Sequence, residues 1–469
     1  MKSTIKACIF SLLFPILAHG QEVGWLRIDP NNREPLTHAA VWGGYEDGRF
    51  RLSHEAHAEW KAGAEALRIG QRPHSTWIGS VSFEQRIGTY TTSSLLFDPI
   101  HYPMDLVDLT RGTKSQQDLR LSGGFLADID DIWAAGFKGS VRAEHASKRK
   151  GIPYGNIGAE AELEPVVTYV IDDNVGVSVS YCGRFRTENA RAKTPGEGAG
   201  SEGLYLDKGM RYVDPLTPGG GAFSILEFAH GFRGEFHSEE ESWGVDMLWK
   251  RGRANGYDNA YRFPGSTLHA FFEYVQSAEN TSHLFGVSYQ RDRDQLRLVG
   301  ADGAFSALSD RVDRNAGLKY RIRFRKGVMK DLALVVDGKQ ATERAMPGSG
   351  FYDKTLRYDG TATLRSSLSY GLFDLDVDLL AGRGWWKDRG KGDPSQTSGA
   401  PLRLTENWFR EMEALMAMRI GAGGSLTCHI PAVDGLFLRL QGSWRRALKV
   451  SYLPGKNREA ITLTVGYDY

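Results

Sequence analysis

The last ten residues, Ala460-Ile461-Thr462-Leu463-Thr464-Val465-Gly466-Tyr467-Asp468-Tyr469, decide the fold of this chain. Large apolar side chains stand at every second position, and the residues between them are small or polar. Because successive side chains of a β-strand point to opposite faces, this pattern predicts a strand with one apolar and one polar face. The alternation continues without a break to the final aromatic residue.

A strand that stops on an aromatic residue while its pattern still runs is unusual for a soluble sandwich. The terminus resembles the β-signal by which outer-membrane barrel proteins are recognised for assembly. That resemblance implies contact with the barrel-assembly machinery. The residues assigned to this assembly signal are Leu463, Val465, Tyr467 and Tyr469.

The same period of two recurs upstream. It is found in residues 175–182, 318–325, 373–379 and 436–445. In a soluble β-sandwich the polar faces of such strands would meet water and the apolar faces would form a core. In a membrane β-barrel the apolar faces meet lipid and the polar faces line the lumen.

The connections between the strands separate these two interpretations, because short turns and long links alternate along most of the chain. The short turns lie near residues 128–131, 172–174, 238–240, 326–330, 371 and 431–435. The long links lie near residues 91–116, 145–156, 188–220, 255–265, 299–316, 343–355 and 387–407. Bacterial barrels have short periplasmic turns and long external loops. The sequence therefore predicts an all-β, transmembrane antiparallel β-barrel of about 18 strands, within a range of roughly 16–20.

Composition and the first residues agree with an exported barrel. The 469 residues include 58 Lys and Arg against 57 Asp and Glu, a balance that gives no support to nucleic-acid binding. Residues 1–20 combine two lysines, an apolar stretch and a small-residue end, which predicts a signal peptide cleaved before Gln21. We expect the barrel to occupy residues 21–469. Cys182 and Cys428 follow opposite phases of their strands and are expected to remain free thiols.

Two polar strand faces carry runs of one charge sign. The basic ladder comprises Lys319, Arg321, Arg323 and Arg325, and the acidic ladder comprises Asp374, Asp376 and Asp378. In a barrel both project into the lumen, where rows of opposite charge can select small polar solutes. The alternative is that the ladders pair with each other and with neighbouring strands and close the lumen. Because arginine makes forked contacts to carboxylate or phosphate, an anionic solute is the first expectation for an open lumen.

One long link and its flanks resemble a specific family. Gly79 to Asp108 (GSVSFEQRIGTYTTSSLLFDPIHYPMDLVD), followed by residues 110–117 and 146–150, is similar to the uncharacterised outer-membrane β-barrel family of Bacteroidetes-type Gram-negative bacteria. The resemblance implies a barrel in the cell outer membrane of a Gram-negative bacterium. It also implies a role as an accessory barrel in an envelope uptake system. The family has no established activity that could be assigned to a residue.

The residues of this link suggest a stiff connection. Asp98-Pro99 and Tyr102-Pro103 restrict it, because the residue before a proline is held in extended or turn geometry. Such a link could form a constriction in the lumen or contact a ligand or partner through Phe97, His101 and Tyr102. The alternative is that it only caps the barrel mouth.

Aromatic and sulfur-containing side chains give further candidates. Trp385 and Trp386 could stack on a sugar, although an aromatic girdle at the membrane interface also explains them. Met412, Met416 and Met418 are expected to form a lipid-facing row on one strand.

Catalytic and metal-binding constellations are absent from this pattern. His54 and His57 lack the spacing of a zinc-protease motif, and on a strand they would point to opposite faces. No nucleophile can be matched with a base. The sequence therefore predicts no enzyme activity, no metal and no cofactor.

The leading functional hypothesis is a channel, or an accessory barrel of an uptake complex, for small polar or anionic solutes. The alternative is a non-conducting surface-binding barrel that recognises a glycan, a metal carrier or a protein through its external loops. The expected partners are outer-membrane lipid, the barrel-assembly machinery and a neighbouring outer-membrane transporter. An outer-membrane hydrolase is the hypothesis with the least support.

Overall fold

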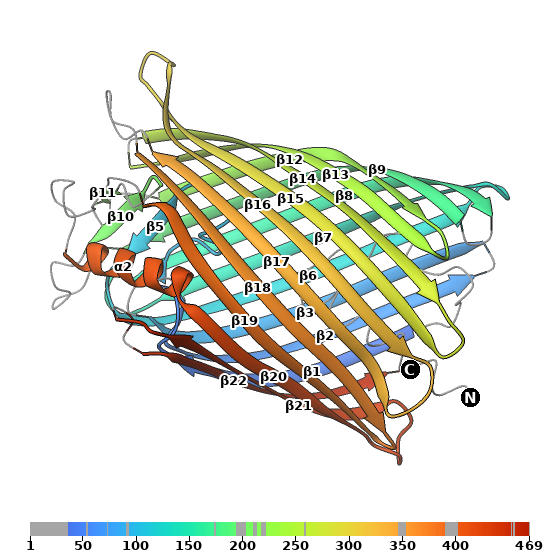
Figure 1. Cartoon of the computed structure of the whole chain (residues 1–469). Helices are drawn as coiled ribbons and strands as arrows, with labels where there is room; N and C mark the ends of the chain where they lie inside the picture. Colours follow the sequence, from blue (N-terminus) through green and yellow to red (C-terminus); the bar gives the residue numbers. More distant parts are fainter. Residues whose placement is uncertain are drawn as a thin grey trace.

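The first strand of the chain pairs with the last. β1 (Leu36–Gly48) forms antiparallel ladders with β2 (Ala58–Arg72) on one side and with β22 (Asn457–Asp468) on the other. All 18 strands of the large sheet are joined in this way, so the wall closes into a barrel without a free edge (Figure 1). The predicted all-β barrel and its strand number are confirmed.

The computed structural model describes most of the chain. The described residues are 36–468, apart from 53–54, 73, 91–92, 173–174, 194–202, 210–212, 217–221, 258, 346–352, 390–401, 452 and 454. The expected signal peptide over residues 1–20 and the terminal Tyr469 lie outside this range, so both assignments stay predictions.

The remaining wall strands follow one another in sequence order and pair with their neighbours. The first group is β3 (Ser75–Tyr90), β6 (Gly112–Asp128), β7 (Trp133–Lys148), β8 (Tyr154–Asp172), β9 (Val175–Ala192), β12 (Ala222–His237), β13 (Glu241–Gly256) and β14 (Asn259–Ser277). The second group is β15 (Thr281–Val299), β16 (Phe305–Phe324), β17 (Met329–Ala345), β18 (Asp353–Tyr370), β19 (Phe373–Arg389), β20 (Met418–His429) and β21 (Leu436–Leu448).

In the described part of the chain, four short strands and one helix do not belong to the barrel wall. They are β4 (Ser93–Ser94), β5 (Asp105–Asp108), β10 (Leu204–Asp207), β11 (Val213–Leu216) and α2 (Leu402–Met416). Within the described ranges, no helix is long and apolar enough to cross a bilayer.

The period of two separates an apolar outer face from a polar inner face. On β22, Leu463 and Val465 are 48% and 43% exposed on the outside, whereas the intervening Thr464 points inward and is buried. Tyr467 belongs to the same outward row. Because a closed barrel satisfies every backbone polar group within the wall, such an outer face can lie in lipid. The role of these residues in assembly stays a prediction.

The short turns that the sequence predicted join consecutive wall strands, whereas the turn at residues 278–280, between β14 and β15, was not predicted. β18 and β19, for example, are joined through Gly371, whose φ of +60° lies in the left-handed region that favours glycine. Cys182 and Cys428 are free, as expected.

Several of the predicted long links are shorter in the structure. β7 and β8 are separated by residues 149–153, β13 and β14 by residues 257–258, and β15 and β16 by residues 300–304. The strands continue beyond the apolar zone, where their outward side chains become polar while the ladder pairing persists. The loss of the apolar alternation was therefore a poor marker of the strand end.

The predicted methionine row is wrong. Met412 is buried and, like Met416, belongs to helix α2, whereas Met418 starts β20 and is exposed on the outer face. The segment contains strong helix formers such as Glu411, Met412 and Glu413, which favour a helix over a strand.

A charge introduced on the outer face of a strand should destabilise the barrel far more than one introduced on its inner face. Leu440 points outward near the middle of β21, and its neighbour Gln441 points into the lumen. We expect Leu440→Arg to lower the free energy of unfolding by about 2–4 kcal/mol, because it places a charge in lipid. Gln441→Arg should change it by less than about 1 kcal/mol. Guanidinium unfolding in lipid vesicles, followed by tryptophan fluorescence, measures both, and equal losses would contradict the assigned faces.

Candidate functional site at the barrel mouth

Two long links fold together at one end of the barrel. β4 and β5 belong to the link between β3 and β6, here called the first link, and β10 and β11 belong to the link between β9 and β12. They form a separate four-stranded sheet, here called the inner sheet, in the order β11-β10-β5-β4. Residues Leu204 to Asp207 pair with Asp108 to Asp105 across the two links. Figure 1 shows β5, β10 and β11 at the same end of the barrel as α2.

Apolar packing fixes the inner sheet against the wall. Leu95, Leu106 and Leu204 are fully or almost fully buried, and they share one cluster with Phe223 and Phe263 of the wall. Burial of each such side chain contributes about 1.5–3 kcal/mol relative to exposure. The inner sheet therefore packs against the wall through one shared apolar core inside the mouth.

A buried ion pair connects the inner sheet to β7. The ammonium group of Lys148 and the carboxylate of Asp108 are both fully buried, and Lys148 Nζ lies 2.5 Å from Asp108 Oδ2. The other carboxylate oxygen of Asp108 accepts bonds from Thr110 N and Thr110 Oγ1 at 2.8 and 2.6 Å. Since buried charges are expensive unless paired and hydrogen-bonded, this arrangement defines where the link turns toward β6.

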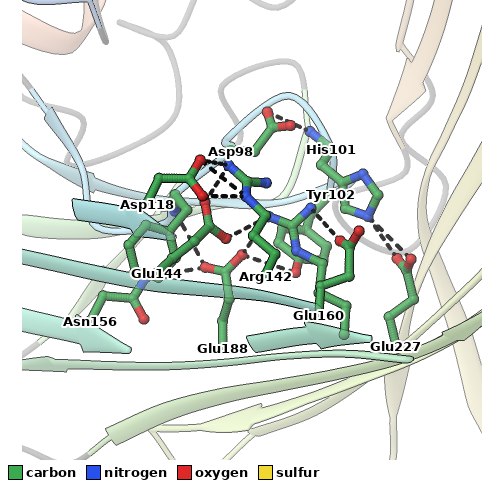
Figure 2. A network of polar contacts seen from close by, with 12 residues as sticks. Asp98, His101, Tyr102, Asp118, Arg142, Glu144, Asn156, Glu160, Glu188 and Glu227 are labelled. Carbon is green, nitrogen blue, oxygen red and sulfur yellow. Dashed lines mark hydrogen bonds and ion pairs between the residues drawn. The ribbon is translucent and has the colours of Figure 1, made fainter. Parts of the chain in front are cut away.

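Glu188 of β9 is the centre of a second polar network (Figure 2). Its carboxylate accepts bonds from Tyr102 OH at 3.0 Å, Asn156 Nδ2 at 3.1 Å and Phe97 N at 3.3 Å. The guanidinium of Arg186 donates to the same carboxylate at 3.1 Å and lies over the Tyr102 ring. Burial and the adjacent Glu188 carboxylate raise the pKa of the Tyr102 phenol well above its usual range, so the hydroxyl remains a donor.

The network extends across the mouth. His101 Nε2 lies 3.0 Å from Glu227 Oε2 on β12, and Arg311 of β16 donates to the carbonyl oxygen of Ile100 at 3.0 Å. The first link is thus held by side chains from β7, β8, β9, β12 and β16. This arrangement narrows the lumen at the end that carries the long links.

The three loop residues expected to meet a ligand lie inside this network. Tyr102 is 2% exposed, and its hydroxyl is used by Glu188. His101 contacts Glu227, and the Phe97 ring occupies the space beside Gly158, where a Cβ atom would lie 2.9 Å away. The sequence placed these residues in a stiff link, but it did not show that they point inward.

Arg186 and Glu188 were not predicted from the sequence as residues of the site. They continue the polar phase of residues 175–182, in which Ser178, Ser180 and Cys182 already point inward. Extending that phase to the end of the strand was the signal that could have found them.

The basic ladder lies on β16, and its charges pair with neighbouring strands. Lys319 Nζ is 3.3 Å from Glu273, Arg321 pairs with Asp331, and Arg323 Nε is 3.9 Å from that same Asp331. Arg325 lies one residue beyond the strand and donates to a turn carbonyl at residue 279.

The acidic ladder lies on β19 and is also satisfied locally. Asp374 contacts His429 at 2.7 Å, and Asp378 contacts Arg365 at 3.4 Å. Asp376 accepts bonds from two serine hydroxyls at 2.7 and 2.8 Å. β17 and β18 separate the two ladders, and among the described contacts no residue of one ladder pairs with the other.

Trp385 and Trp386 lie on opposite faces of β19. Trp385 is 51% exposed on the outer face and stacks on Tyr358. Trp386 points inward, with the Arg357 guanidinium 5.7 Å from its ring centroid. Helix α2 packs close to this part of the strand, because a Cβ on Gly384 would lie 2.0 Å from the carbonyl oxygen of Leu415.

Side chains for metal chemistry are not brought together in the described ranges. No group of three or more His, Cys, Asp or Glu residues there could hold a metal ion. The geometry instead provides a narrowed mouth, a charged lumen and a lipid-facing wall.

A closed, edge-free barrel with an apolar outer face and a polar lumen defines an outer-membrane β-barrel protein of the Gram-negative type. A family model described as "Family of unknown function (DUF6850)" matches residues 29–469. The chain belongs to this family. No curated protein matches the sequence.

Several solved outer-membrane proteins are similar to the chain in fold. The alcaligin outer membrane receptor FauA from Bordetella pertussis is 9% identical, with a TM-score of 0.49 and coverage of 93% of this chain and 76% of that chain. The FrpB iron transporter from Neisseria meningitidis is 9% identical, with a TM-score of 0.43 and coverage of 95% and 83%. The outer membrane transporter YddB from Escherichia coli is 7% identical, with a TM-score of 0.44 and coverage of 92% and 80%.

The buried ion pair gives a test of how the inner sheet is held. Lys148→Met removes the cation from Asp108, and we expect the docking of the first link to weaken by about 3–5 kcal/mol. Hydrogen exchange of the amides in β5 measures this loss while the wall amides serve as the internal reference. The double variant Lys148→Met, Asp108→Leu should recover much of the protection, because no unpaired buried charge is left at this position. Unchanged exchange in the single variant would contradict a structural role for the pair.

Proposed function

We propose that the protein is a transport barrel that passes small polar solutes, with a preference for anions, around the inner sheet. The finer part of the proposal, in which it serves as an accessory barrel beside an outer-membrane transporter, rests on the family resemblance alone.

The observation that carries the proposal is the exposure of inward-pointing charges away from the inner sheet. The side chains of Lys319, Arg365 and Asp378 are 38%, 46% and 49% exposed although they point into the barrel. By contrast, Arg186 and Glu188, beside the inner sheet, are 4% and 0% exposed. Because charges in a packed interior are covered by partners, half-exposed charges indicate water in that part of the lumen. These residues place the water-accessible side at β16 to β19.

The preference for anions rests on the basic residues of β16, which face the same water as the acidic ladder of β19. Arg321 and Arg323 both lie within ion-pair distance of Asp331. Arg323 is 33% exposed and Asp331 only 9% exposed, so a solute meets the cation first. Forked contacts from arginine favour carboxylate or phosphate groups. The surface-binding alternative lacks comparable support, since Phe97 and Tyr102 are turned inward.

Planar-bilayer conductance tests the proposal. We expect the purified protein to conduct, and Lys319→Gln with Arg323→Gln to shift the permeability ratio toward cations. The expected size is about two- to fourfold per charge, as for a unit charge about 5–10 Å from a solute in water. The matched control is Arg191→Gln with Arg446→Gln, which removes two exposed basic residues from the outer face.

A second variant distinguishes a closed gate from a barrel that never conducts. Replacing residues 95–107 by a short Gly-Ser link removes β5 and the apolar contacts of the first link. We expect a larger conductance, because the constriction is lost. Silence of both the native protein and this variant, in correctly folded and heat-modifiable form, would contradict transport by diffusion.

A further inference from the structure

The outer face of β13 to β18 carries a dense group of arginines above the apolar zone. Arg291 of β15 is the direct cross-strand partner of Arg314 on β16. Nearer the long links, Arg253, Arg262 and Arg297 form a row on three adjacent strands. Like charges in directly opposed positions destabilise a sheet unless something lies between them.

The phase of the strands shows that these side chains face outward. Arg291 shares its phase with Val287, which is 51% exposed on the lipid-facing surface, and Arg314 shares its phase with Leu318, which is 58% exposed. The inward ladder residue Lys319 has the opposite phase. The arginines therefore do not belong to the lumen.

Five basic side chains line a cavity on the outer surface of these strands. Its volume is about 320 Å³, and it is lined by Arg291, Arg293, Arg314, Arg344, Lys354 and one carboxylate, Asp310. Asp310 is already contacted by Arg293 at 3.2 Å. Arg314 donates to the amide oxygen of Gln340 at 2.9 Å, so a neutral group holds its guanidinium in place without compensating the charge. The excess of positive charge is therefore local and built into the wall.

The position of the cavity along the strands shows which layer of the membrane it faces. A tilted strand crosses the hydrocarbon in roughly 9–11 residues. Counted from the ends of β15 and β16 at the short turns, this distance brings the chain to Arg291 and Arg314. Both arginines then stand at the level of the outer-leaflet headgroups, and the apolar side chains Val287 and Leu318 lie just below them.

We propose that this cavity binds the phosphate groups of a phosphorylated glycolipid of the outer leaflet. A phosphate between Arg291 and Arg314 accepts forked hydrogen bonds from both guanidinium groups and offsets their mutual repulsion. The acyl chains of the same molecule lie against the apolar surface below, which a free phosphate could not use. A lipid source therefore fits the site better than a soluble anion.

Native mass spectrometry of the detergent-solubilised full-length protein, titrated with bis-phosphorylated lipid A, tests this site. We expect Arg291→Gln with Arg314→Gln to raise the dissociation constant at least about tenfold, the size of one lost hydrogen bond to a charged group. Arg191→Gln with Arg446→Gln removes the same number of exposed, outward arginines from isolated positions and should change it by less than about twofold. Arg344→Gln with Lys354→Gln is a second pocket variant, and it carries the test if the first does not fold.

The phosphate and lipid parts of the ligand are tested separately. Lipid A from which both phosphates have been removed should bind at least about tenfold more weakly to the native protein. Inorganic pyrophosphate should compete only at concentrations far above those of the glycolipid. Equal binding of phosphate-free lipid A, equal losses in the pocket and control variants, or pyrophosphate binding as tight as that of the glycolipid would each overturn the proposal.

Discussion

The hydrogen-bonded seam between β1 and β22 is the constraint on which the rest of the structure depends. Lipid offers no partner for an unpaired backbone N–H or C=O group, so a sheet can lie in a bilayer only if it has no edge. The seam runs from His38, opposite Asp468, to Gly48, opposite Arg458. Side chains reinforce it on the lumen side, where His38 lies 2.7 Å from the carboxylate of Asp468.

Closure also determines what the polar residues must do. At the level of the hydrocarbon, the charged residues of each strand can point only inward, where they pair with neighbouring strands or with the links, whereas the outward arginines lie above this zone. Asp331 and Asp374 are examples of the first kind, and Glu188 and Lys148 are examples of the second. The barrel is thus held by paired charges on the inside and by apolar contact with the bilayer on the outside.

The fold was predictable because its main signal is local. Residues 436–445 and 460–468 show the apolar alternation without knowledge of their partners, and the spacing of turns gave the strand number. The inner sheet was not predictable in this way, because β5 and β10 are each four residues long and pair across distant parts of the chain. The sequence located the charge ladders, but the distances that decide their partners exist only in the folded wall.

The unequal lengths of the wall strands give the barrel a sloping rim. β15 has 19 residues and β22 has 12, and both cross the same bilayer. At a tilt of about 45°, the difference raises one side by about 16 Å. A solute that diffuses along the cell surface therefore reaches the lumen over a lower rim on the side of β20 to β22. Helix α2, which precedes β20, lies beside this lower part of the rim, whereas the longer strands on the opposite side extend above the headgroups.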